Sequence, residues 1–126
     1  MSKTAVTSPE LAPPVGPFSQ AIEVGGLLYC SGQVGQDPMT GKLVAGGIAA
    51  ETDRLFQNLS ALLKAAGKSV DDVVRVGVYL TNISDYVTFN GIYAKHFSQP
   101  FPARTVIGVA ALPLGACVEI DLVVKA

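Results

Sequence analysis

The middle of the chain, residues 50–80, reads AETDRLFQNLSALLKAAGKSVDDVVRVGVYL and changes its periodicity halfway along. In the first half the apolar residues recur every three or four positions, at Leu55, Phe56, Leu59, Leu62, Leu63 and Ala66. This spacing predicts an amphipathic helix over residues 50–66. Acidic residues in its first turn, a lysine near its end and Gly67 as the C′ residue agree with that prediction. Such a helix needs a sheet or another helix to cover its apolar face.

The second half of this stretch ends in VVRVGVYL, residues 73–80, whose β-branched residues predict a buried strand. A second helix is expected next, because Asn82 or Ser84 can cap it. Its face would carry Ile83, Tyr86, Phe89, Asn90, Tyr93 and Phe97. After a proline-containing break, two last strands are expected over residues 104–110 and 117–124.

The first third of the chain predicts a hairpin. Residues 18–24 and 27–34 have strand character and flank the turn pair Gly25-Gly26. Residues 37–41 then suit a second turn, which leads into a short strand over residues 42–44.

The predicted element order is β-β-β-α-β-α-β-β, in which two helices pack on one face of a mixed sheet. This is an α+β fold, in a single domain over residues 1–126 that begins with a stiff, extended, proline-rich arm over residues 1–16. No third layer is left to cover the other face of the sheet. Charged residues make up only 15% of the chain and apolar residues 49%. We therefore expect sister subunits to cover that face.

Composition argues against several classes of protein. Nine basic against ten acidic side chains, with no basic run, give no electrostatic footprint for nucleic acid. A single histidine and the absence of calcium-loop spacing argue against a metal site. Cys30 and Cys117 lie in separate apolar runs, as reduced thiols do. No leader peptide or membrane span is recognisable, so a cytoplasmic location without a membrane partner is expected.

Arg104 is the one formal charge between Lys95 and Glu119. A buried guanidinium without a partner is costly, and its planar, bidentate geometry suits a carboxylate. Alternation along the last strand puts Glu119 on the face opposite the helix-facing residues Val118, Ile120, Leu122 and Val124. Arg104, on the preceding strand, is the expected neighbour of Glu119. The two form either an interfacial ion pair or a site in which Arg104 holds a substrate carboxylate and Glu119 handles a proton or positions water.

Five groups of residues, in order over nearly the whole chain, resemble the RidA family, also called YjgF-type reactive intermediate deaminases. They are GPFSQA at 16–21, SGQ at 31–33, Asn90 with Tyr93, FPART at 101–105, and ALPLGA at 111–116 with Glu119 and Ile120. The resemblance implies a chorismate-mutase-like trimeric fold. It also implies a homotrimer with ligand clefts between subunits.

The resemblance further implies hydrolysis of 2-aminoacrylate and related enamine or imine acids, released by pyridoxal-phosphate enzymes, to 2-oxo acids and ammonia. Arg104 would hold the substrate carboxylate, and Glu119 would orient water and move its proton. No cofactor is required, because an iminium is already electrophilic. The other residues expected to bind substrate are Phe18, Ser31, Gly32, Asn90 and Val106.

Two residues depart from the family pattern. Phe18 stands where members active on imines commonly have tyrosine, and Val106 stands where bacterial members often have cysteine. Phe18 favours an alternative, a non-catalytic trimer that binds small carboxylic acids such as 2-oxo acids as a sensor or carrier. Asn90 also fits a buried core or interface amide. A ribonuclease, another role ascribed to the family, is disfavoured by the acidic pI of about 5.7.

Overall fold

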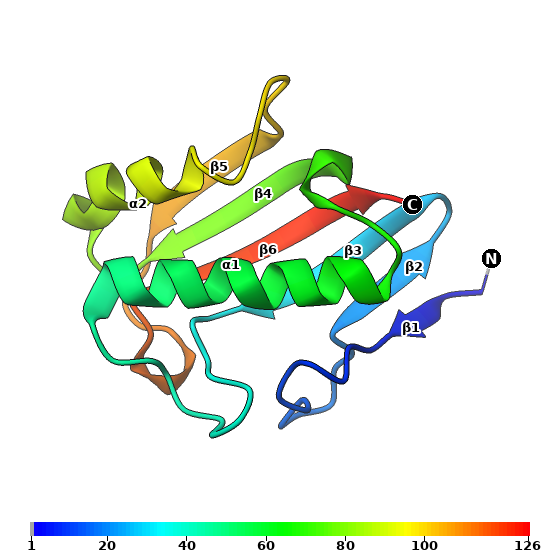
Figure 1. Cartoon of the computed structure of the whole chain (residues 1–126), viewed down its shortest axis with the longest axis horizontal. Helices are drawn as coiled ribbons and strands as arrows, with labels where there is room; N and C mark the ends of the chain where they lie inside the picture. Colours follow the sequence, from blue (N-terminus) through cyan, green and yellow to red (C-terminus); the bar gives the residue numbers. More distant parts are fainter. Residues whose placement is uncertain (1) are drawn as a thin grey trace.

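The computed structural model of the chain describes residues 2–126 as one six-stranded sheet and a layer of two α-helices (Figure 1). The elements are β1 (Thr4–Val6), β2 (Ala21–Val24), β3 (Leu27–Gln33), α1 (Gly47–Ala65), β4 (Val73–Leu80), α2 (Tyr86–Tyr93), β5 (Ala103–Gly108) and β6 (Val118–Lys125). The strand order is β1-β2-β3-β6-β4-β5, in which β4 and β5 are parallel and the other neighbours antiparallel. The predicted α+β class with a mixed sheet is confirmed.

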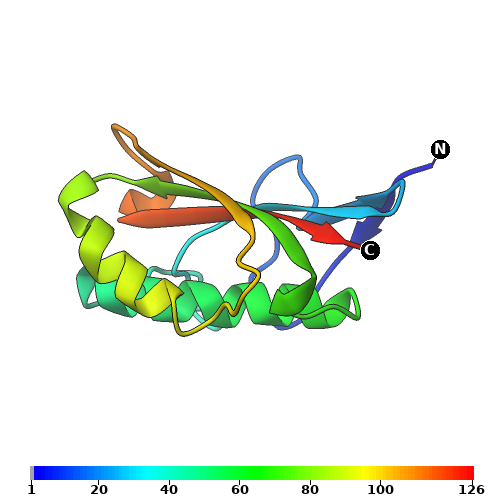
Figure 2. The ribbon, with the colours of Figure 1, turned by 90° about the horizontal axis from the view of Figure 1, so that it is seen from above.

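Both α-helices lie on the same side of the sheet, and no α-helix covers the opposite side, called the bare face below (Figure 2). The predicted apolar face of α1 is buried through Leu55, Phe56, Leu59, Leu62 and Leu63. It packs over the alternate residues of β6 that were expected to face the helices, namely Val118, Ile120, Leu122 and Val124. Removal of these side chains from water is the main term that holds the helical layer on the sheet.

The order of element types agrees with the prediction, but one strand differs. Residues 42–44 contribute only a single bridge, between Gln36 and Leu43, instead of the third predicted strand. The additional strand is β1, which lies within the arm expected to be merely extended and pairs with β2 at the edge of the sheet. The paired residues of β1 and β2, from Val6–Ala21 to Thr4–Glu23, are not joined by a tight turn, so no local turn signal could reveal the pairing.

The helix α1 begins earlier than its acidic residues suggested. It starts at Gly47, so Glu51 and Asp53 lie beyond its first turn, which contains no acidic residue. Ile48 packs against the core and so favours the additional turn. The predicted C-terminal end is confirmed, because Gly67 follows the cap residue Ala66 with a left-handed backbone.

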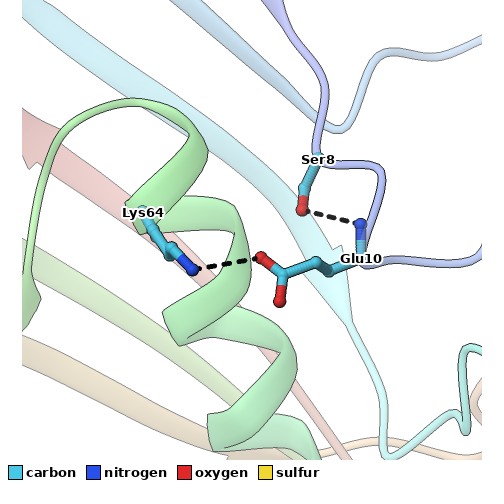
Figure 3. Close-up of polar contacts among 3 residues, drawn as sticks. All are labelled: Ser8, Glu10 and Lys64. Atoms are coloured by element: carbon cyan, nitrogen blue, oxygen red, sulfur yellow. Dashed lines mark hydrogen bonds and ion pairs between the residues drawn. The ribbon is translucent and has the colours of Figure 1, made fainter.

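The N-terminal arm is tied to the rest of the molecule by polar contacts and one apolar anchor. The Ser8 N–H donates to Oε1 of Gln20 at 2.6 Å, and the Glu10 N–H donates to Ser8 Oγ at 3.2 Å. The Glu10 carboxylate lies 3.8 Å from Lys64 Nζ on α1 (Figure 3). This ion pair is exposed and contributes little to stability, whereas Leu11 is buried in the core. The arm is therefore part of the fold.

Gly67→Ala is expected to lower the free energy of unfolding by about 1 kcal/mol, because an alanine Cβ disfavours the left-handed φ of +72°. The matched control is Gly91→Ala on α2, where the added Cβ also meets no atom within 4 Å. That change should raise the free energy of unfolding by about 0.5–1 kcal/mol. Urea denaturation of both variants at one protein concentration checks the pair, and shifts in the same direction would contradict this explanation.

Candidate functional site

Arg104 lies on β5 and is held by residues of α2. Its Nη1 donates to Asn90 Oδ1 at 2.9 Å and its Nη2 donates to the Tyr86 hydroxyl at 3.1 Å. The guanidinium carbon also lies 4.6 Å from the centroid of the Tyr93 ring, within the range of a cation–π contact. All three partners are neutral, so they orient the guanidinium without cancelling its charge.

A cavity of about 340 Å³ opens beside this guanidinium. Its lining residues are Asn90, Tyr93, Ala94, Phe101, Pro102 and Arg104. Among residues 2–126 the one ion pair within 4 Å joins Glu10 and Lys64, so no carboxylate of these residues pairs with Arg104. Further N–H groups of the guanidinium are therefore free to bind an anion, and a planar carboxylate fits them bidentately.

The pKa values of the two tyrosines beside Arg104 are shifted in opposite directions. The pKa of Tyr86 is lowered, first by its hydrogen bond with Asn90 and then by the positive charge of Arg104. The pKa of Tyr93 is raised by burial, which outweighs the same positive charge. Sequence analysis placed Tyr86 and Tyr93 on the expected face of this helix without assigning them a contact to Arg104. Their spacing on one helical face with Asn90 was visible in the sequence, but their contact with β5 was not.

Glu119 lies on β6, on the bare face of the sheet, opposite Tyr79 of β4. This is the face that strand alternation predicted. A Cβ added to Gly32 would lie 2.5 Å from Glu119 Oε2, so only glycine leaves room for the carboxylate at this place. Burial raises the pKa of Glu119, and the negative charge of Asp121 raises it further.

A second and larger cavity, of about 430 Å³, adjoins Glu119. Gly32 and Phe18 also line it, so the structure brings together three of the residues that sequence analysis assigned to the site. Phe18 comes from the loop after the proline-rich arm and is 54% exposed. The floor of this cavity also includes Gln20, whose buried Nε2 has no hydrogen-bond partner in the described part of the chain.

Ser31 and Val106 do not line either cavity. The Ser31 hydroxyl donates to the carbonyl of Ser19 at 2.6 Å and so ties β3 to the loop that carries Phe18. Val106 lies beside Val78 in the sheet and packs against the hydrophobic core. Within one chain, Ser31 therefore holds the loop that carries Phe18, and Val106 holds β5 on the hydrophobic core, but neither residue lines a cavity.

The prediction that Arg104 neighbours Glu119 is wrong within one chain. β6 does not return beside β5 but inserts between β3 and β4, so β4 separates the two residues. They also belong to opposite faces, because Arg104 is in register with the buried, helix-facing Val76. A one-chain ion pair is thereby excluded, and the candidate residues form two separate groups, one at each cavity.

Sequence analysis missed the role of Glu51. This residue is buried on α1, and its Oε1 accepts a hydrogen bond from the Cys117 N–H at 2.8 Å. It thereby fixes the chain just before β6 and the loop that lines the Glu119 cavity. Its position one turn before Leu55, on the buried face of the helix, was the available signal.

Both cysteines are free thiols with weak reactivity. Burial raises the pKa of Cys30 to about 12. Burial and a hydrogen bond with Glu51 raise the pKa of Cys117 to about 11. Neither is a ready nucleophile at neutral pH. Within residues 2–126, no three histidine, cysteine or acidic side chains gather to hold a metal ion, and no helix is long and apolar enough to cross a membrane.

Comparison with known proteins shows the family. A family model described as endoribonuclease L-PSP matches residues 9–126. The 2-iminobutanoate/2-iminopropanoate deaminase of Dermatophagoides farinae is 42% identical over 125 residues, which cover 98% of each chain. The human protein of the same name is 46% identical over 109 residues, 86% of this chain and 80% of the relative.

Solved structures agree with the sequence comparison. RidA from an Antarctic Psychrobacter superposes with a TM-score of 0.93 at 39% identity, over 98% of this chain and 99% of that one. A putative endoribonuclease from Thermotoga maritima gives a TM-score of 0.93 at 37% identity, over 98% and 97% of the two chains. The fold and its cavities define a chorismate-mutase-like α+β protein with an arginine and a carboxylate at separate sites. The chain belongs to the RidA family, whose matching model carries the endoribonuclease L-PSP description.

Proposed function

We propose that this protein hydrolyses 2-aminoacrylate-type enamine and imine acids to 2-oxo acids and ammonia. The observation that carries the proposal is Arg104, a guanidinium held by three neutral side chains beside an open cavity, with no carboxylate from the described residues paired to it. A carboxylate of a small acid is the ligand that suits it. Relatives named as imine deaminases support the reaction class.

The chemistry requires one further group, and Glu119 suits it. Its raised pKa makes it a stronger base than an ordinary carboxylate, and it borders a cavity large enough for substrate and water. Water adds to the carbon of the protonated imine while Glu119 takes a proton. Glu119 then gives this proton to nitrogen, and it takes the proton of the new hydroxyl group as the carbonyl forms and the carbon–nitrogen bond breaks. The 2-oxo acid and ammonia leave, and the last proton passes to ammonia, which becomes ammonium. No cofactor is consumed in this hydrolysis.

The two groups have to belong to different subunits for one substrate to meet both. Arg104 and Glu119 occupy opposite faces of the sheet in one chain, so the cavity at Arg104 would be completed by the Glu119 cavity of a neighbour. The bare face supports such an assembly, because Tyr29 and Ile107 are each 46% exposed on it. We therefore place the reaction in clefts between the subunits of a homotrimer.

The trimer has a direct test. Sedimentation equilibrium should give three times the 13.1 kDa mass of the chain. A monomeric mass at micromolar concentration would contradict the proposed cleft between subunits, because Arg104 and Glu119 of one chain cannot meet the same substrate.

Activity is tested with 2-aminoacrylate generated in the reaction by a serine dehydratase. The protein should release pyruvate faster than spontaneous hydrolysis does, in proportion to its concentration. The competing function is a non-catalytic trimer that binds small carboxylic acids, favoured by Phe18, which lacks a hydroxyl that could contact substrate or water. Binding of pyruvate without any acceleration of its release would favour that alternative.

Ribonuclease activity is the other function that the comparisons raise, through the description of the matching family model. The formal net charge of −1 and the absence of a run of basic residues in the sequence give no support for binding to a phosphate backbone. RNA cleavage that follows the protein through repeated purification and survives Arg104→Ala would establish a separate activity.

A further inference from the structure

The face of α1 that packs on the sheet is not entirely apolar. Glu51 is 5% exposed on it, and Asn58, two turns further along, is 2% exposed. A buried carboxylate or amide is costly unless it makes hydrogen bonds, so its partners show what it holds in place. Both side chains bind segments that border the Glu119 cavity.

Glu51 holds the start of β6. Its Oε1 accepts a hydrogen bond from the Cys117 N–H at 2.8 Å, across 66 positions of the chain. Cys117 directly precedes β6, and Glu119 follows two residues later on that strand. The Glu51 bond therefore fixes the chain next to the proposed base from outside the sheet.

The same part of α1 also meets the loop after β3. A Cβ added to Gly35 would lie 2.6 Å from the Glu51 carbonyl oxygen and 2.7 Å from its Cα, so only glycine lets the loop pass this close to the helix. On either side of Gly35, the carbonyls of Val34 and Gln36 accept hydrogen bonds from Asn58 Nδ2, at 3.2 and 2.9 Å. Both of these acceptor residues line the same cavity as the base. One helix thus holds the start of β6 and the loop after β3 together.

The sheet itself is irregular at this place. In the ladder between β3 and β6, two residues of β3 stand opposite Asp121 alone, as in a β-bulge. The ladder ends with the pair Gln33–Ile120, and Glu119 lies one residue beyond it. The Glu119 carboxylate nevertheless occupies the room that Gly32 leaves on β3. The contacts with α1 therefore help to set the separation of these two residues.

The loop that leads to Cys117 has a strained backbone. Leu114 in this loop has a φ of 62°, and it lines the Glu119 cavity. A leucine rarely adopts this left-handed conformation, in which its Cβ is crowded. Such strain persists where the surrounding structure holds the chain in place. The Glu51 bond is one such contact, at the C-terminal end of the loop.

We propose that Glu51 is a positioning residue for Glu119. By binding the Cys117 N–H from α1, it keeps the Glu119 carboxylate in the room beside Gly32, where it meets water and substrate. Glu51 itself lines neither cavity, so it acts through Glu119 and not on the substrate. This inference rests on the proposed function for the role of Glu119 as the base.

The test compares kcat and KM for 2-aminoacrylate in variants of the full-length chain. Glu51→Leu has no acceptor for the Cys117 N–H and should lower kcat by about tenfold or more, since a displacement of about 1 Å can cost about 10²-fold. KM should change by less than about twofold, because the bonds to the substrate carboxylate are not altered. If Glu51→Leu does not fold, Glu51→Met takes its place, because methionine fills irregular space and is only a weak acceptor.

Two further variants separate the hydrogen bond from the packing of α1. Glu51→Gln keeps an oxygen acceptor at the same place and should retain kcat within about twofold. Thr52→Val is the matched control, because Thr52 is the next residue of α1 and is equally buried. Its hydroxyl has no hydrogen-bond partner among residues 2–126, so Thr52→Val should leave kcat unchanged.

The Glu119→Gln background separates positioning from a general effect on the fold. The base is already lost there, so the addition of Glu51→Leu should lower the remaining rate by less than about twofold. A further tenfold loss in this background would overturn the proposal. An unchanged kcat in Glu51→Leu, or an equal loss in Thr52→Val, would also overturn it.

A second measurement does not depend on turnover. NMR titration of the Glu119 carboxyl carbon, assigned with Glu119→Gln, gives the pKa of Glu119 in each variant. Burial holds this pKa above its ordinary value, and the negative charge of Asp121 acts in all variants alike. Release of the carboxylate into solvent in Glu51→Leu should therefore lower the pKa toward about 4.3, whereas Thr52→Val should leave it in place.

This titration distinguishes failure of the inference from failure of the proposed function. If the unchanged protein does not hydrolyse 2-aminoacrylate above the spontaneous rate, the deaminase function fails. A lower pKa of Glu119 in Glu51→Leu would then still support the positioning role, and an unchanged pKa would overturn it.

Discussion

Arg104→Ala is expected to lower kcat/KM for 2-aminoacrylate by roughly 10²–10³-fold. The guanidinium is already oriented by Asn90 and Tyr86, so its bonds to a substrate carboxylate cost little further ordering. Two charge-assisted hydrogen bonds are worth roughly 3–4 kcal/mol in such a site, which gives this loss. The measurement is the initial rate of pyruvate release over a range of substrate concentrations.

Two further variants separate geometry from charge. Arg104→Lys keeps the charge but loses the planar fork, so it should recover only a small part of the lost activity. Arg54→Ala is the matched control, because Arg54 also donates two side-chain hydrogen bonds, both to the amide oxygen of Asn58, but lines neither cavity. Its kcat/KM should change by less than about twofold. Equal losses in Arg54→Ala and Arg104→Ala would show that the effect is a general one on stability.

The faces of individual strands could be predicted from the sequence, whereas the order of the strands could not. Alternation along residues 118–124 is local, and it placed Glu119 correctly on the face away from the helices. The position of β6 between β3 and β4 depends on pairings with strands far away in the chain. For that reason the sequence suggested a one-chain neighbour for Glu119 that the sheet does not provide.

The surroundings of Arg104 show the same limit. The periodicity of residues 83–97 indicated a helix with Tyr86 and Asn90 near one face, but it did not indicate which strand that face would meet. Leu114 gave no signal at all, because leucine is not a residue that predicts a left-handed backbone. The family motifs identified which segments contribute to the site, but they did not show how those segments are arranged in space.

Glu119→Gln is expected to lower kcat by roughly 10²–10⁴-fold, the usual contribution of a general acid–base group. Glutamine has nearly the same shape and still fits against Gly32, but it cannot take the proton from water. The matched control is Asp121→Asn, which changes the neighbouring carboxylate on the same face, one that accepts a hydrogen bond from Tyr79 at 2.7 Å. Asp121→Asn should retain activity at neutral pH.

The pH dependence distinguishes a base from a merely structural carboxylate. Burial and the charge of Asp121 raise the pKa of Glu119, so activity should fall on acidification at a pH above the usual carboxyl value of about 4.3. Asp121→Asn removes one of those causes and should move this acid limb to lower pH. A raised pKa means that the ionised form of Glu119 is less favourable in the folded than in the unfolded protein, so its ionisation lowers the free energy of unfolding as the pH rises. Glutamine carries no charge, and Glu119→Gln should therefore not lower the urea midpoint at pH 7. Two results would contradict the role of Glu119 as the base. One is a Glu119→Gln variant that loses activity and also has a lower urea midpoint. The other is an Asp121→Asn variant whose activity falls at the same acidic pH as that of the unchanged protein.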